Sequence, residues 1–273
     1  MASFRFKQVD VFTKVPFQGN PVAVVIGAEG LETEAMQRIA NWTNLSETTF
    51  LLKSAVADYK LRIFTPRMEL PFAGHPTIGS AHAALESGFV PKKSKLTQEC
   101  GAGIMQLDVQ EGRIAVRAPA AKISAVNEPI GVSVISAAER IDVGAVWVIA
   151  EVADAKMLAA LKPDVPLVTR LSEKLGLAGI TVFAKSDDCV AAIHVRSFAP
   201  AHGIAEDPVC GTGNVAVAAY LSRHGQLDRF GASYVARQGA QCGRDGRVYM
   251  RIDGEAIYLG GDAVTCIDGT LQA

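Results

Sequence analysis

The sequence lacks the features that would assign it to a membrane, secreted or nucleic-acid-binding class. No run approaches the roughly 18 apolar residues that a membrane span needs, and residues 1–7 contain no apolar stretch typical of a signal peptide. The 27 basic residues are balanced by 28 acidic ones, so the net charge of -1 gives no argument for a nucleic acid or membrane partner. We therefore expect a soluble cytoplasmic protein.

Metal-binding and nucleotide-binding patterns are missing as well. The five cysteines form neither a disulfide framework nor a metal-ligand spacing, and the five histidines show no ligand spacing either. No glycine-rich loop has Walker spacing, and no Gly-x-Gly-x-x-Gly motif lies in a strand–helix–strand unit. The sequence thus predicts a protein with no metal and no cofactor, and it does not favour a nucleotide phosphate as ligand.

One arrangement of residues occurs twice in the chain. The pattern Arg-x-Phe-x-Pro at residues 62–66 precedes the stretch 70–77, and the same pattern at residues 196–200 precedes the stretch 206–214. Each stretch follows a strand-like run and leads into an apolar helix. The repetition favours a duplicated unit, in which short strands surround one long apolar helix.

Both helices are apolar on every side, which is typical of helices in the interior of a fold. The first is expected to begin at His75, with Pro76 where no N–H is needed, and to be capped by Gly88. The second is expected over residues 212–224. The predicted fold class is therefore α+β, with two pseudo-symmetric domains, each a mainly antiparallel β-sheet rolled around a central apolar helix.

The repeat also predicts where the two halves meet along the chain. Residues 118–127 are irregular, with prolines nearby, and are the expected linker. The first half-unit is assigned to residues 1–120, to which residues 264–273 can be added, and the second half-unit to residues 121–263.

The start of each apolar helix is a candidate binding site for an anion, because its backbone N–H groups need partners and the helix dipole favours negative charge. Glycines at positions 74, 211 and 213 allow a ligand to approach the backbone closely. Two such ends would bind a small anionic metabolite such as a carboxylate. Capping by Asp207 or Thr212 is the alternative, and the two interpretations are compatible.

Four side chains in or near these stretches are candidates for chemistry. Glu47 lies at the entry to a strand, where a buried carboxyl group can act as a general acid/base, although a solvated loop glutamate is the more frequent case. His75, at a helix start, is expected to be neutral or to cap the helix. Asp207 is suited to a turn or cap. Cys210 is either a thiol whose pKa the helix lowers or a small buried apolar residue.

Arg62 and Arg196 occupy equivalent positions in their strands. Either residue can meet a substrate, or each can be a charge on the surface of a sheet. The second interpretation is favoured here, because long charged side chains are mostly exposed.

The motifs, taken in order, resemble those of a known family. Residues 10–24, 46–50, 72–77 and 206–213 look like the corresponding segments of the PhzF (phenazine-biosynthesis-like) family, and the match extends over nearly the whole chain. The resemblance implies a diaminopimelate-epimerase-like fold, with the active site in the cleft between two domains. It also implies an isomerase that often forms homodimers.

The resemblance assigns roles to individual residues. The matching glutamate, Glu47, is the implied acid/base of the isomerisation, with His75 and Asp207 assisting. The residues expected to bind the substrate beside them are Asn20, Ser46, Gly74, Pro76, Thr77, Gly211, Thr212 and Gly213.

A departure from the wider superfamily bears on the reaction. Its racemases and epimerases use two cysteines, one at each helix start, whereas here Ala73 stands at the first position and only Cys210 remains. A single thiol does not supply two bases, which counts against a racemase. Three functions stay open: an acid/base isomerase of a small carboxylate-bearing metabolite, a Cys210-dependent amino- or imino-acid racemase or dehydratase, and a non-catalytic binding protein for small carboxylates.

Overall fold

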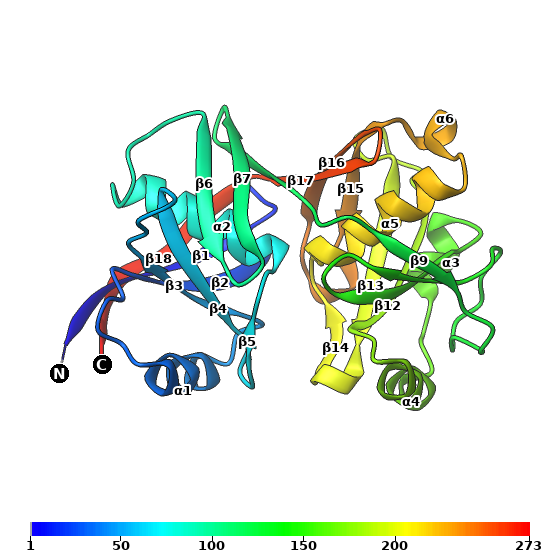
Figure 1. The fold of residues 1–273 in the computed structure, drawn as a ribbon. Coiled ribbons are helices and arrows are strands. Elements are labelled where there is room, and N and C mark those ends of the chain that lie inside the picture. Colours follow the sequence, from blue (N-terminus) through cyan, green and yellow to red (C-terminus); the bar gives the residue numbers. More distant parts are fainter. Residues whose placement is uncertain (1) are drawn as a thin grey trace. The chain divides into compact units, whose positions relative to one another are not determined.

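In the computed structural model, which describes residues 2–273, the chain forms two compact units (Figure 1). Unit 1 is Met1–Arg117 together with Gly260–Ala273, and unit 2 is Ala118–Leu259. Each unit combines helices with strands in both parallel and antiparallel pairs, which confirms the expected mixture of α and β structure. No helix within residues 2–273 is long and apolar enough to cross a membrane.

Unit 1 contains strands from both ends of the chain. They are β1 Ser3–Val11, β2 Asn20–Ile26, β3 Thr48–Leu52, β4 Tyr59–Phe64, β5 Glu69–Leu70, β6 Lys95–Cys100, β7 Gly103–Gln110, β8 Arg113–Arg117 and β18 Ala263–Gln272. Strand β1 lies between β18 and β2 and is antiparallel to both. The two termini are consequently adjacent, and Ala2 and Ala273 exchange backbone hydrogen bonds of 2.6 and 2.9 Å (Figure 1).

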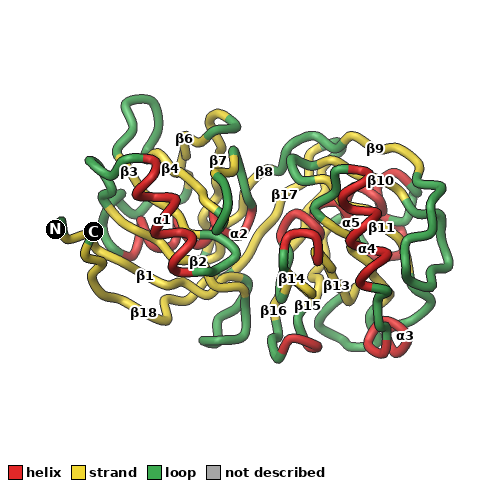
Figure 2. The backbone as a smooth tube through the Cα atoms, turned by 90° about the horizontal axis from the view of Figure 1, so that it is seen from below, coloured by secondary structure: helices red, strands yellow, loops and turns green. Residues whose placement is uncertain are grey.

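The helix α2, Gly74–Glu86, is the centre of unit 1. Ten of its residues are buried, and strands β1 and β2 lie against it (Figure 2). Gly79 makes this contact close, because a Cβ atom there would lie 2.4 Å from Val22 Cγ1. The chain leaves the helix at Gly88, whose φ of 72° favours glycine. The second helix of the unit, α1 Thr33–Thr43, packs Met36 and Ala40 against β3 and β4.

Unit 2 contains the remaining strands and a second buried helix. Its strands are β9 Lys122–Ala125, β10 Glu139–Asp142, β11 Val146–Glu151, β12 Gly179–Lys185, β13 Ile193–Ala199, β14 Ile204–Asp207, β15 Ser233–Gln238, β16 Gly246–Asp253 and β17 Ala256–Gly261. Its helices are α3 Ala155–Ala160, α4 Val165–Leu175, α5 Gly211–Arg223 and α6 Leu227–Phe230. Helix α5, like α2, has 13 residues, of which ten are buried.

The strands of the two units pair in the same order. In unit 1, β2–β3 is parallel, β3–β4 and β4–β5 are antiparallel, β4–β6 is parallel and β6–β7 is antiparallel. In unit 2, β11–β12 is parallel, β12–β13 and β13–β14 are antiparallel, β13–β15 is parallel and β15–β16 is antiparallel. The buried helix also occurs at the same point of this order in each unit. Helix α2 lies between β5 and β6 in the sequence, and α5 lies between β14 and β15.

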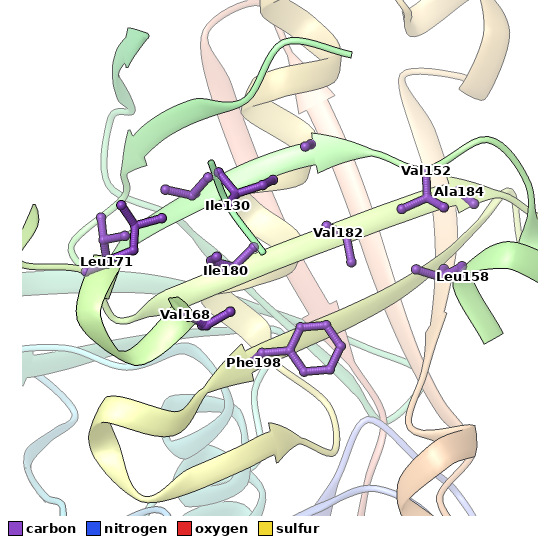
Figure 3. Close-up of a cluster of buried hydrophobic side chains, with 12 residues drawn as sticks. Ile130, Val152, Leu158, Val168, Leu171, Ile180, Val182, Ala184 and Phe198 are labelled. Carbon is purple, nitrogen blue, oxygen red and sulfur yellow. The ribbon is translucent and has the colours of Figure 1, made fainter. Parts of the chain in front are cut away.

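A second apolar layer covers the other face of the unit 2 sheet. Val168 and Leu171 of α4 belong to the same cluster as Ile180, Val182 and Phe198 of the strands (Figure 3). Burying apolar side chains on both sides of the sheet explains why β12 is buried along almost its whole length.

Two expectations from the sequence are wrong. The segment 118–127, which was expected to be irregular, contains strand β9, which pairs with β10; a short strand with little buried surface leaves almost no apolar alternation to detect. Arg196 is not a surface charge, because it is only 6% exposed and its guanidinium binds Glu206 through two hydrogen bonds of 2.8 and 2.7 Å. Arg62 makes the same two-fold contact with Glu69, at 2.7 Å for both bonds.

Candidate active site

The acid/base candidates of unit 1 come together around the first turn of α2. Glu47 lies directly before β3, and His75 is the second residue of α2. The structure brings His75 Nε2 to 3.3 Å from Glu47 Oε2, although the two residues are 28 positions apart in the sequence. The exposed fractions of the two side chains are 7% for His75 and 15% for Glu47, so Glu47 is the member of the pair that solvent or a ligand can reach.

The surroundings of His75 determine where its protons lie. Burial lowers the pKa of His75 to about 3, so the imidazole is neutral at ordinary pH. The ring also makes a hydrogen bond with the backbone of Pro21, and since Nε2 faces Glu47, the nitrogen that donates to the Pro21 carbonyl is Nδ1. Nε2 then presents a lone pair to Glu47 Oε2. A hydrogen bond at this contact can form only if Glu47 carries the proton.

The start of α2 leaves backbone donors for an anion. Its N-cap residue, Ala73, has no side chain that can accept a hydrogen bond, and Pro76 has no N–H. The N–H of Thr77 bonds to the carbonyl of Ala73. Gly74 and His75 therefore carry the N–H groups of this first turn that are available to a ligand.

The other binding candidates of unit 1 differ in how accessible they are. Ser46 is half-buried, like Glu47, whereas Gly74, Pro76, Thr77 and Asn20 are buried. The hydroxyl of Thr77 accepts a hydrogen bond of 3.2 Å from Gln98, whose own oxygen accepts one of 3.0 Å from the Tyr59 hydroxyl. Thr77 therefore anchors the helix to the core of the unit.

In unit 2, Asp207 ends strand β14 immediately before α5. Its Oδ1 accepts a hydrogen bond of 3.1 Å from the N–H of Val209, as in an Asx turn. Burial raises the pKa of Asp207 to about 6, and the hydrogen bonds from Cys210 and Val209 oppose this shift. A carboxyl group with this pKa is partly protonated near neutral pH and can donate as well as accept a hydrogen bond.

Cys210 caps α5 through its sulfur. The thiol accepts a hydrogen bond of 3.3 Å from the N–H of Gly213 and is buried. Burial and the neighbouring charge of Asp207 raise the pKa of the thiol well above its ordinary value. The possibility that the helix start lowers this pKa is therefore wrong, because loss of solvation outweighs the helix dipole here.

The remaining candidates at the start of α5, residues 211–213, differ in how far they are buried. Thr212 is half-buried, and its hydroxyl accepts a hydrogen bond of 3.0 Å from Trp147 Nε1. The same hydroxyl lies 3.8 Å from the sulfur of Cys210, so both neighbours of Thr212 Oγ1 in this region are groups of the protein. Gly211 is buried, and Gly213 faces the protein interior, where a Cβ atom would lie 2.7 Å from Thr181 Oγ1 and 2.9 Å from Ser197 Oγ.

A buried glutamine in each unit was missed from the sequence. Gln98 bonds to Thr77, the fourth residue of α2. Gln238 accepts a hydrogen bond of 2.9 Å from Asn214, the fourth residue of α5, and donates one of 2.9 Å to the carbonyl of Asp207. The detectable signal was a polar residue on the apolar, alternating face of each strand that follows the helix.

Metal binding has no support in the described part of the chain. Residues 2–273 contain no group of three or more His, Cys, Asp or Glu side chains that could hold a metal ion.

Solved structures define the class of fold. A PhzF-family phenazine biosynthesis protein from Bacillus anthracis superposes with a TM-score of 0.89, at 30% sequence identity, with 100% of both chains covered. A hydroxyproline epimerase from Agrobacterium vitis superposes with a TM-score of 0.65, covering 98% of this chain and 92% of that one; at 15% identity it shows a shared fold alone. The chain thus has the fold that phenazine-biosynthesis-like proteins and amino-acid epimerases share.

The sequence then identifies the family. The family model described as PhzC-PhzF, phenazine biosynthesis-like protein, matches residues 9–269, and the chain belongs to this family. Antisense-enhancing sequence 1 of Schizosaccharomyces pombe is 38% identical, with 98% of this chain and 99% of that protein covered. A trans-2,3-dihydro-3-hydroxyanthranilate isomerase of Pseudomonas chlororaphis is 32% identical, with 96% and 97% covered. The expected resemblance is therefore confirmed.

Proposed function

We propose that this chain is a cofactor-independent isomerase of a small carboxylate-bearing metabolite, acting by a general acid/base proton shift. The observation that carries the proposal is the contact of 3.3 Å between Glu47 and His75, with the imidazole held by Pro21. Relatives with isomerase names, which match nearly the whole chain, support it. That the protein is a homodimer stays a prediction of the family resemblance.

Glu47 is the group that moves the proton. It carries the proton shared with His75 and donates it to the carbon at one end of an unsaturated system in the substrate. The carboxylate that results removes a proton from the carbon at the other end, while the double bonds shift between them. No atom is gained or lost, and Glu47 returns to its starting state. General acid/base catalysis of this kind contributes roughly 10²–10⁴ in rate.

In this proposal His75 orients the carboxyl group of Glu47 and does not become protonated itself. Its Nδ1–H is held by Pro21, so Nε2 can only accept from Glu47, and burial disfavours the imidazolium. A neutral acceptor keeps the proton on the glutamic acid, where the substrate can receive it. The same contact stabilises one rotamer of Glu47, which keeps the acid in place.

The start of α5 in unit 2 has groups that suit a carboxylate-bearing ligand as well. Asp207, with a pKa near 6, can donate a hydrogen bond to a ligand oxygen. The backbone N–H groups of Gly74, His75, Gly211 and Thr212 suit a carboxylate. The order of strand pairing and the Arg–Glu contact are common to both units, and they support two domains of the same design.

Replacement of Glu47 by Gln tests the proposal with little change in shape. The Gln amide can donate to His75 Nε2 as the glutamic acid does, but it cannot transfer a proton. Exchange of substrate C–H groups would be followed by ¹H NMR in D₂O, first with trans-2,3-dihydro-3-hydroxyanthranilate and then with a panel of small unsaturated carboxylates. We expect exchange with the native protein and a loss of at least about 100-fold in Glu47→Gln.

Glu32→Gln is the matched control, because Glu32 precedes α1 and its side chain makes no capping hydrogen bond. We expect it to retain exchange. Equal exchange in Glu47→Gln and the native protein would remove Glu47 from the chemistry. Saturable binding of carboxylates without any exchange in the native protein would instead favour a non-catalytic binding protein.

A further inference from the structure

A pocket of about 270 Å³ lies in unit 2 on the sheet face opposite α5. Helix α3 forms one wall, and the neighbouring strands β13 and β15 form the floor. Its lining includes Lys156, Asp187, His194, Arg196 and Arg237, together with the turn at residues 239–241. None of the residues assigned above to the acid/base site is among them.

Strand register places the basic side chains of this pocket together. In the parallel pair β13–β15, His194 lies beside Arg237. Arg196 follows His194 by two residues and therefore points to the same face of β13. Gln238, the neighbour of Arg237, points to the opposite face, where it meets Asn214 of α5. Side chains alternate between the two faces of β13 and β15. The basic residues therefore lie on one face, and Gln238, which binds the carbonyl of Asp207, lies on the other.

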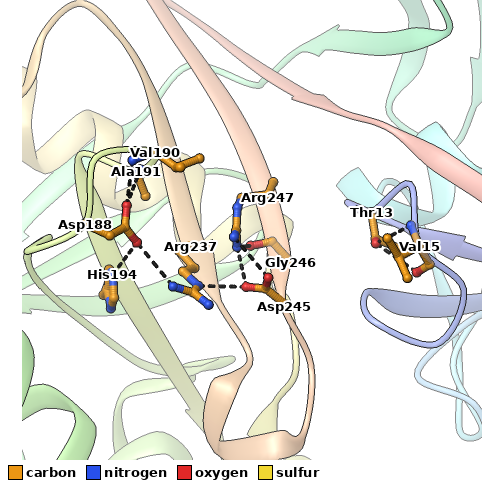
Figure 4. A network of polar contacts seen from close by, with 10 residues as sticks. All are labelled: Thr13, Val15, Asp188, Val190, Ala191, His194, Arg237, Asp245, Gly246 and Arg247. Atoms are coloured by element: carbon orange, nitrogen blue, oxygen red, sulfur yellow. Dashed lines mark hydrogen bonds and ion pairs between the residues drawn. The ribbon is translucent and has the colours of Figure 1, made fainter.

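The acidic partners of these residues hold them from outside the pocket. Arg237 Nε donates to Asp245 at 2.7 Å, and its Nη1 donates to Asp188 at 3.3 Å (Figure 4). Asp188 also accepts from His194, at 3.2 Å, and both carboxylate oxygens of Asp245 accept from Arg247 (Figure 4). Neither Asp188 nor Asp245 lines the pocket. Asp187 is the acid that does, against Lys156, Arg196 and Arg237.

The three positive groups differ in the donors that they keep for a ligand. Arg196 keeps few, because four of its five guanidinium N–H groups bind Glu206 and the carbonyls of Leu158 and Leu161. Arg237 uses Nε and Nη1, which leaves Nη2. Lys156 is exposed, and within residues 2–273 its ammonium group has neither a hydrogen bond nor an ion pair. The pocket therefore combines the guanidinium group of Arg237, which two aspartates hold in place, with the exposed ammonium group of Lys156.

We propose that this pocket binds a small oxyanion, the phosphate or carboxylate group of a metabolite. Phosphate and carboxylate oxygens accept charge-assisted hydrogen bonds from Arg and Lys, and the held guanidinium loses little conformational entropy on binding. A volume of about 270 Å³ accommodates such a group together with a few further atoms. The pocket is a second binding site, separate from the acid/base pair.

Another pocket of unit 2 lacks this chemistry and supplies a control. It is larger, about 510 Å³, and its ionisable lining residues are Lys162 and Asp164. Asp164 is engaged in capping α4, where its carboxylate accepts the N–H of Leu167 at 3.0 Å. Lys162 and Lys156 are both exposed lysines of unit 2, but only Lys156 lies beside a second cation.

Titration of the ¹⁵N-labelled full chain with inorganic phosphate, at constant ionic strength, tests the proposal. We expect saturable shifts of the Arg237 side chain and of the amides at residues 155–159 and 239–241. Lys156→Ala should weaken binding about tenfold, as expected for one charge-assisted hydrogen bond, and Lys156→Glu should abolish it. Lys162→Ala should bind as the native protein does.

A parallel titration with malonate separates the two sources of oxyanion. Tighter binding of phosphate assigns the pocket to phosphorylated compounds, and tighter binding of malonate assigns it to carboxylates; both outcomes support the proposal. No saturable shift, or native affinity in Lys156→Glu, would overturn it. Shifts confined to residues 211–213 that disappear in Thr212→Val would also overturn it, by placing the ion at the start of α5.

Discussion

Gly213 donates its backbone N–H to the sulfur of Cys210 at 3.3 Å, which makes the thiol the N-cap of α5. The corresponding positions of α2 are Ala73 and Pro76, which have neither an acceptor side chain nor an N–H. In α5 the N-cap side chain has an acceptor and the third helical residue has an N–H, whereas in α2 both are absent. The cysteine retained in unit 2 has a local structural reason, and its absence in unit 1 leaves no donor unsatisfied at the third position.

Substitutions at Cys210 should consequently affect stability more than chemistry. Cys210→Ser keeps an acceptor for Gly213, whereas Cys210→Ala removes it, so we expect Cys210→Ala to lose about 1 kcal/mol of unfolding free energy and Cys210→Ser to lose less. Deuterium exchange into the substrate should survive in both variants. Denaturant unfolding and the exchange assay measure the two effects, and loss of exchange in both variants would make the thiol a catalytic base.

Gly213→Ala should destabilise the protein in spite of the higher helix propensity of alanine. A new Cβ atom would lie 2.7 Å from Thr181 Oγ1 and 2.9 Å from Ser197 Oγ, and overpacking of this kind costs about 1–3 kcal/mol. Gly269→Ala is the control, because no heavy atom lies within 4 Å of its Cβ position. Adding Ser197→Ala should recover part of the loss. Equal unfolding midpoints for Gly213→Ala and Gly269→Ala would contradict the prediction.

His75 should be neutral at pH values where an ordinary histidine is charged. Burial lowers its pKa to about 3, so at about pH 5 the ring should carry a single proton, on Nδ1. Long-range ¹H–¹⁵N NMR distinguishes the two neutral tautomers and the imidazolium, and comparison with His75→Gln assigns the signals. An imidazolium at this pH, or a proton on Nε2 alone, would contradict the proposed role of Glu47 as the proton donor.

Asp207 and His75 should influence stability in opposite directions as pH changes. The pKa of Asp207 rises from 3.8 to about 6 on folding, so its contribution is favourable below about pH 4 and is lost as pH rises through about 6. The pKa of His75 falls from 6.5 to about 3, so its cost appears as pH falls below about 6.5. Between these limits the two effects largely cancel.

Removing Asp207 should expose this cancellation. Relative to the native protein, Asp207→Asn should gain on the order of 2 kcal/mol of unfolding free energy between about pH 4 and pH 7. His75→Gln should show the opposite trend, gaining relative to the native protein as pH falls. Denaturant unfolding at a series of pH values measures both. A difference that does not change with pH for Asp207→Asn would show that its carboxyl group titrates normally.

Local signals in the sequence were sufficient for the two buried helices. Gly88 and Pro76 mark the ends of α2, and the structure starts this helix within one residue of the prediction. The pair Glu111-Gly112 is likewise a local signal for a hairpin turn, and it connects β7 to β8 with φ values of 51° and 83°. These features depend on neighbouring residues, so a single sequence contains the information.

Features that depend on distant partners were harder to predict. The family resemblance assigned Glu47 and His75 to one site, but their direct contact was not predicted, because nothing in the spacing of 28 residues indicates it. The Arg196–Glu206 contact was missed, since an arginine in a strand looks the same whether or not an acid lies on the next strand. Gln98 and Gln238 were missed for the same reason, because each binds a residue of a helix that begins more than 20 residues earlier in the sequence.

The pairing of β1 with β18 has a consequence for the newly synthesised chain. Unit 2 is one continuous segment, residues 118–259, whereas unit 1 combines residues from before and after it. Strand β1 therefore has both of its neighbours only when residues 263–272 have been synthesised. Until then one edge of β1 is open to pairing with another chain, so a chain shortened before β18 should be prone to aggregation.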